Sequence, residues 1–208
     1  MLNPQLSMAH FTTLLTPQEQ SGFRPGNVRV VLLSAGMRLF KLTGYGAFDG
    51  RAADPNNPGR VPRLSVQSPW WSPVKKFEED RMGAIGRLQE AEANGLSLKD
   101  MVRFASCVKY NWNNLENYVE IMLSTPAYAF WGQFAPMGQR DDGAIENPNF
   151  PELLGGLDDA WQLYIPGMRG FHYKRVTSIN ATDHAALRTH LAKQVVHGRS
   201  NVTGGWQR

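Results

Sequence analysis

Three polar residues lie within or beside apolar, strand-like runs of the 208-residue chain and are its best candidates for chemistry: Arg38, Ser72 and Gln162. A guanidinium among apolar residues either lies at a sheet edge with its charge in water, or meets an anion in a cleft. For Arg38, a position at the edge of a sheet is the more common explanation. Gln162 follows Trp161 at the start of a short apolar run that ends at Pro166 and Gly167. Its amide carries no charge and interacts through hydrogen bonds. Gln162 is therefore either a residue that binds a ligand or an ordinary polar residue of a strand.

Other kinds of active site lack their usual sequence signatures. The five histidines form no H-E-x-x-H pair, and Cys107 is the only cysteine, so we expect neither a metal site nor a disulfide. The sequence contains no G-x-S-x-G nucleophile elbow, no dinucleotide-binding glycine fingerprint and no P-loop. We read Cys107 as a packing residue inside a helix.

The overall charge is mildly basic, with a net charge of +4 and a pI near 9.3. The Lys and Arg residues are scattered, which argues against a nucleic-acid surface but would suit an anionic ligand such as a dinucleotide. An ordinary soluble domain explains the same charge. The single cysteine, the lack of a long apolar run and the lack of a signal-peptide start favour folding in the cytoplasm without a membrane span.

The pattern of elements predicts a single α+β domain over residues 27–199, with a loosely ordered arm at 1–26 and a mobile tail at 200–208. It has split antiparallel sheets at both ends of the chain and a central pair of helices. The expected strands are 28–33, 37–44, 61–67, 127–137, 161–168 and 171–176. The first helix should begin at Pro73 and end near Gly95. The second should run from Ser97 to Met122, because apolar residues recur there at spacings of four and three. A last helix should run from Asp183 to His197.

The order of these elements resembles mono-ADP-ribosyltransferases, a family that includes many bacterial toxins and effectors. The resemblance depends on the strand with Arg38, the segment Ser-Pro-Trp-Trp-Ser that ends at Ser72, and the segment Gln-Leu-Tyr-Ile-Pro-Gly that begins at Gln162. It implies a compact split-sheet fold and NAD as the substrate. The enzyme would cleave the nicotinamide–ribose bond and transfer the ADP-ribose to a target protein or release it. Export as an effector, and a protective partner or immunity protein, would fit the same family.

The resemblance also implies roles for individual residues. Arg38 would contact NAD, Ser72 would brace the nicotinamide pocket, and Trp71 or Tyr45 would stack on the ring. Gln162 would take the position of the catalytic Glu, which makes it, with Arg38, the expected catalytic pair. A Gln at this position departs from the family, because an amide cannot offset positive charge as a carboxylate does. A neighbouring acid would have to supply that charge (Asp158, Asp159 or Glu152), or else the site binds without transferring.

Two other functions fit the sequence. The chain could be a non-enzymatic structural or accessory protein that buries its aromatic loops and long helix against a partner protein. It could also be an enzyme for another small molecule, with a general base from the acidic loop 141–159.

Overall fold

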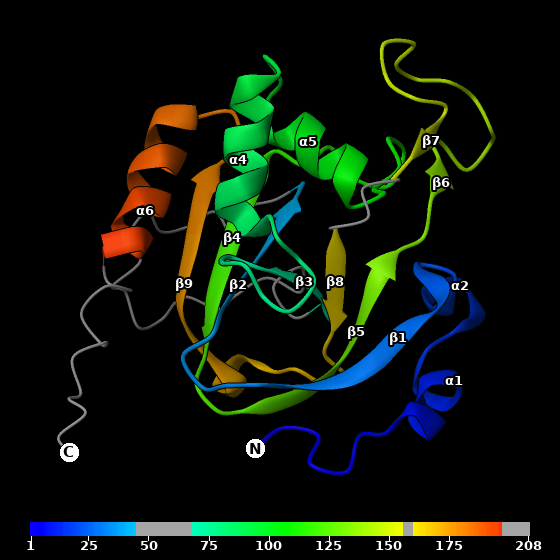
Figure 1. Ribbon diagram of the computed structural model, residues 1–208, viewed down its shortest axis with the longest axis vertical. Helices are drawn as coiled ribbons and strands as arrows, with labels where there is room; N and C mark the ends of the chain where they lie inside the picture. Colours follow the sequence, from blue (N-terminus) through cyan, green and yellow to red (C-terminus); the bar gives the residue numbers. More distant parts are fainter. Residues whose placement is uncertain (45–67, 156–159, 197–208) are drawn as a thin grey trace, which may run out of the picture.

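Antiparallel strands dominate the fold (Figure 1). The computed structural model describes residues 1–44, 68–155 and 160–196. The strands are β1 (Phe23–Leu33), β2 (Arg38–Thr43), β3 (Trp70–Pro73), β4 (Asn117–Leu123), β5 (Ala127–Phe134), β8 (Trp161–Tyr164) and β9 (Tyr173–Asn180), with a separate pair β6 (Met137–Gly138) and β7 (Leu153–Leu154). The main sheet has the order β1-β5-β8-β3-β2-β4-β9. The helices are η1 (Met8–His10), α1 (Phe11–Leu14), α2 (Pro17–Gln20), α4 (Gly83–Ala93), α5 (Leu98–Ala105), η2 (Gly170–His172) and α6 (His184–Val196).

The main core lies on one face of the sheet and joins its two halves. It contains Leu39 of β2 and Ile121 of β4 together with Trp71, Trp131 and Leu163 from β3, β5 and β8. These residues alternate along their strands with residues of the opposite face, as the period of a β-strand requires. The two halves of the sheet therefore bury a common apolar surface.

The opposite face is covered by different helices in its two halves. Phe40 and Tyr118 pack against α4, α5 and α6, which Figure 1 shows grouped together at one end of the molecule. At the other half, Phe130 and Tyr164 pack against Leu15, which follows α1. The N-terminal residues thus contribute to the core, and β1 begins at Phe23, inside the segment we expected to be a loose arm.

The first central helix begins later than its sequence predicted. Pro73 is the last residue of β3, where it pairs with Leu39, and α4 starts only at Gly83. The start is fixed by Asp80, whose carboxylate accepts hydrogen bonds from the backbone N–H groups of Met82 and Gly83. The same carboxylate lies 3.1 Å from the guanidinium of Arg87, and both side chains are fully buried. A buried ion pair therefore sets the start of this helix, and sequence periodicity could not reveal it.

The predicted helix from Ser97 to Met122 is wrong beyond its first two turns. Ser97 does cap α5, accepting the N–H of Asp100 at 3.1 Å, but the helix ends at Ala105. Cys107 has a φ of +52° and lies buried in the turn after the helix, so it packs there rather than inside a helix. Asn residues at 111, 113 and 114 continue the chain as a loop, and 117–123 form β4. The 3–4 spacing continues into β4 by coincidence, because Val119 and Met122 are three positions apart and lie on opposite faces of the strand.

The class and the remaining elements agree with the sequence. The protein has an α+β single-domain fold with one large antiparallel sheet and several helices. Strands form at five of the six predicted places, and the sixth, 61–67, lies outside the described residues. Asp183 caps α6 through the N–H of Ala186. The longest described helix has 13 residues, and none in the described part of the chain has the length and apolar character needed to cross a membrane.

Candidate functional site

The candidate site lies where β2 and β3 separate. These strands pair only through Leu39 with Pro73 and Phe40 with Ser72. Beyond that point β2 continues beside β4, whereas the start of β3 pairs with β8. A cavity of about 1150 Å³ opens here, bounded also by the loop after α5 and by the N-terminal residues Gln18 to Gly22. Its volume is slightly larger than that of typical small-molecule sites, which are about 300–1,000 Å³.

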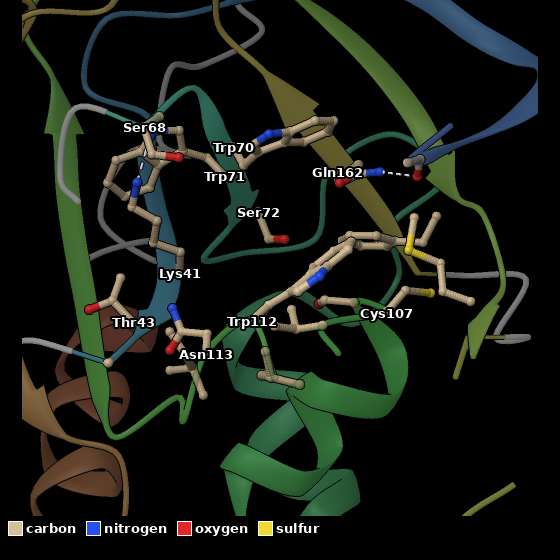
Figure 2. A pocket seen from close by; sticks show the side chains of 18 of the residues that line it. Lys41, Thr43, Ser68, Trp70, Trp71, Ser72, Cys107, Trp112, Asn113 and Gln162 are labelled. Carbon is tan, nitrogen blue, oxygen red and sulfur yellow. Dashed lines mark hydrogen bonds between the residues drawn. The ribbon is translucent and has the colours of Figure 1, made fainter. Parts of the chain in front are cut away.

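Ser72 and Gln162 face this cavity together. The β3–β8 register ends at the pair Trp71 and Leu163, and Ser72 and Gln162, each one position beyond it, both line the cavity. Both are nearly buried, at 6% and 5% exposure. The amide of Gln162 donates through Nε2 to the carbonyl oxygen of Gly22 at 2.6 Å. That bond fixes the amide and leaves its oxygen for the cavity, as Figure 2 shows.

The hydroxyl of Ser72 is available for a ligand. It has no hydrogen-bond partner within residues 1–44, 68–155 and 160–196, although the side chain is almost completely buried. Its oxygen is not among the fully enclosed polar atoms that lack a partner in the described residues, so it reaches the space of the cavity. Ser72 and Gln162 thus offer one hydroxyl and one carbonyl oxygen to a ligand that enters between β3 and β8.

Lys41 supplies a cation at the other side of the strand separation. Its ammonium group donates to the backbone oxygen of Ser68 at 3.2 Å and lies 4.0 Å from the centre of the Trp71 ring. Burial lowers the pKa of Lys41 to about 7, because the charged form has lost much of its hydration. Lys41 was not among the site residues predicted from the sequence. It directly follows Phe40, which pairs with Ser72.

Arg38 is not brought to the cavity. Its guanidinium forms an ion pair with the buried carboxylate of Glu120 on the neighbouring strand. The same carboxylate accepts the hydroxyl of Tyr118 at 2.6 Å and contacts Nε2 of His190 at 2.8 Å. Burial raises the pKa of Tyr118 well above its usual range, which keeps its hydroxyl a donor. Arg38 therefore neutralises a buried acid, and neither the sheet edge nor the anion cleft considered for it applies.

Trp71, one of the two expected stacking rings, lines the cavity but offers it little surface. Trp71 is 2% exposed and belongs to the main core, with Lys41 over its ring. Tyr45 lies outside the described residues. Several rings line the cavity; among them Trp70 is half-buried, and Trp112 is 44% exposed. The helix predicted for residues 97–122 placed Trp112 on its buried face, which was wrong. The three Asn residues around Trp112 are typical of a loop and could have indicated its exposure.

Of the nearby acids proposed to supply the missing negative charge, only Glu152 belongs to the described residues. Glu152 does not line the cavity, and Asp158 and Asp159 lie outside the described residues. Glu19 and Glu116 do line it. The carboxylate of Glu19 is already bound, because it accepts the N–H of Thr16 at 2.8 Å and the hydroxyl of Tyr164 at 3.0 Å. Burial, with this contact to Glu19, raises the pKa of Tyr164 to about 12.

In the part of the chain that the structure describes, no three His, Cys, Asp or Glu side chains gather as a metal-binding group. Comparison with protein-family models, with curated proteins and with solved structures finds no match to the chain. The cavity and its side chains are therefore the basis for the functional argument.

Proposed function

We propose that the protein binds NAD in the cavity between β2 and β3 and cleaves the bond between nicotinamide and ribose, transferring the ADP-ribose or releasing it. One observation carries the proposal. Ser72 and Gln162 stand 90 positions apart in the chain, both belong to the resemblance to mono-ADP-ribosyltransferases, and both line one cavity from adjacent strands.

The side chains suit the polar groups of NAD. The free hydroxyl of Ser72 can hydrogen-bond the carboxamide of nicotinamide, and the carbonyl oxygen of Gln162 can accept a ribose hydroxyl. Lys41 brings positive charge for the diphosphate, whereas Arg38, which the resemblance placed in contact with NAD, is paired with Glu120. We therefore assign Ser72 and Gln162 to the nicotinamide riboside and Lys41 to the phosphates.

Cleavage follows from the charge of the bound molecule. When the bond from C1′ of the ribose to the ring nitrogen breaks, its electron pair goes to nicotinamide and cancels the ring's positive charge. Positive charge then develops on the ribose until water, or a side chain of a target protein, attacks C1′ and loses a proton. A carboxylate stabilises that charge better than an amide does. With Gln162 at this point, we expect NAD to bind and to be cleaved slowly.

The test is a calorimetric titration with NAD, together with an assay of nicotinamide release. Ser72→Ala and Gln162→Ala should each weaken NAD binding about fivefold or more, the effect of one lost hydrogen bond. Gln133→Ala is the matched control, because Gln133 is a buried glutamine on the neighbouring β5 that does not line the cavity. Failure of the wild-type protein to bind NAD at millimolar concentration would refute the proposal.

A further inference from the structure

The loop after α5 lacks regular secondary structure, yet it is held firmly from inside the molecule. The guanidinium of Arg103 is buried and donates to three of its carbonyl oxygens: to Val108 at 2.9 Å, Lys109 at 3.0 Å and Asn113 at 2.7 Å. The same guanidinium stacks on the ring of Tyr110 at 4.2 Å. One core cation therefore fixes the path of the chain on both sides of Trp112.

The loop is held from outside as well. The carboxylate of Asp141 accepts the indole N–H of Trp112 at 2.7 Å, the amide of Asn111 at 3.0 Å and the ammonium of Lys109 at 2.9 Å. Hydrogen bonds from Lys109 and Trp112 lower the pKa of Asp141, so it is an anion at neutral pH. The ring of Trp112 is thus oriented by polar contacts while 44% of the residue stays exposed.

An oriented, exposed indole in a cavity is a stacking surface for a flat ring. Figure 2 shows this indole turned toward the same space as Ser72 and Gln162, with Asn113 on the side nearer Lys41. A ring that stacks on Trp112 would displace water from its own face and from the face of the indole. The loop is already ordered, so binding would not have to order it. Preorganisation of this kind favours affinity.

The neighbouring amides offer hydrogen bonds to the edge of such a ring. The Oδ1 of Asn113 accepts the N–H of Leu115 at 2.8 Å, which orients the amide and leaves its Nδ2 as a donor. The side chain of Asn114 has no hydrogen bond to the described residues and lines the same cavity. A side-chain amide pairs with adenine because it presents a donor and an acceptor side by side, matching N7 and the amino group of the base.

We infer that the segment Asn111–Asn114 is an adenine-binding subsite, in which Trp112 stacks on the base and the amides of Asn113 and Asn114 bind its edge. The inference rests on the proposed function for one point only, that the ligand is a dinucleotide. The phosphates would then extend from this subsite toward Lys41, and the nicotinamide riboside toward Ser72 and Gln162.

The experiment titrates the full-length protein with NAD, ADP, GDP and nicotinamide mononucleotide by calorimetry. Trp112→Ala should weaken ADP and NAD binding about tenfold to a hundredfold, the effect of one lost base-stacking contact, and Trp112→Phe should restore most of it. Nicotinamide mononucleotide should bind both variants as it binds the wild type. GDP should bind at least about fivefold more weakly than ADP. Phe171→Ala is the control, because this aromatic residue is 77% exposed and lies outside the cavity.

The outcomes separate this inference from the proposed function. If ADP binds the wild type and Trp112→Ala equally well, the subsite is refuted even where NAD is cleaved. If ADP binds in a Trp112-dependent way but nicotinamide mononucleotide does not bind and NAD is not cleaved, the subsite is supported and the proposed function fails. If neither NAD nor ADP binds at millimolar concentration, both the adenine subsite and the proposed function are refuted.

Discussion

The ammonium group of Lys41 lies 4.0 Å from the centre of the Trp71 ring, across the point where β2 and β3 separate. The two residues lie on neighbouring strands, and both line the cavity. No carboxylate within the described residues pairs with this ammonium, so its stabilisation comes from the ring and from the carbonyl of Ser68. A cation held in this way is free to meet an anionic ligand.

The lowered pKa of Lys41 predicts how stability depends on pH. In the unfolded chain a lysine keeps its proton up to about pH 10.4, whereas the folded protein releases it near pH 7. Between these values the unfolded state binds more protons, so the free energy of unfolding should rise with pH, by at most about 1.4 kcal/mol per unit. Urea unfolding from pH 6 to 10 should show this rise in the wild type relative to Lys41→Met. Parallel curves for the two proteins would contradict the assignment.

The same group predicts how ligand affinity depends on pH. Lys41 carries its charge below pH 7 and loses it above, so NAD affinity should fall between pH 6 and 8.5. Lys41→Arg should remove most of that dependence, because a guanidinium stays charged throughout. Calorimetric titrations of both proteins across this range provide the measurement. An equal pH dependence in the two proteins would assign it to another group.

Arg38 should matter for stability more than for binding. Removing its guanidinium leaves the buried carboxylate of Glu120 with Tyr118 and His190 as its remaining partners, which we expect to lower the free energy of unfolding by about 3 kcal/mol. The NAD affinity of folded Arg38→Ala should stay within about twofold of the wild type, because Arg38 does not line the cavity. Lys174→Ala on β9 is the control: Lys174 is exposed, and its loss should change stability by less than about 0.5 kcal/mol. A large loss of affinity in Arg38→Ala would place that residue in the site after all.

Gln162→Glu should separate binding from turnover. A carboxylate at this position can offset the positive charge that develops on the ribose, so nicotinamide release should become at least about tenfold faster. The same change removes the donor to Gly22 and should destabilise the fold by about 1–3 kcal/mol. Nicotinamide release at saturating NAD, with unfolding measured in parallel, tests both effects. An unchanged or lower rate in a folded variant would argue against Gln162 as the residue at the ribose.

The sequence predicted the strands well because each is a short apolar run bounded by turn residues, as in Ala127–Phe134 and Trp161–Tyr164. It failed where long-range contacts decide the local structure. Residues 117–123 become a strand because β2 and β9 pair on both sides of them, and α4 starts where Asp80 meets Arg87. Propensity alone does not report such contacts.

The residues of the site also include some that the sequence predicted and some that it did not. Ser72 and Gln162 could be chosen from short segments because each is a polar residue at a strand with a recognisable pattern. Lys41 could not be told from Arg38, since only the separation of β2 from β3 decides which cation meets the cavity. The exposed position of Trp112 could not be predicted either, because it depends on a loop whose path is fixed by contacts with Arg103 and Asp141.

The most direct measurement is a crystal structure of the protein with NAD at saturating concentration. We predict the nicotinamide carboxamide within hydrogen-bond distance of the Ser72 hydroxyl, and a ribose hydroxyl at the Gln162 oxygen. NAD bound at another surface, or an empty cavity under conditions where the protein is saturated, would contradict the account.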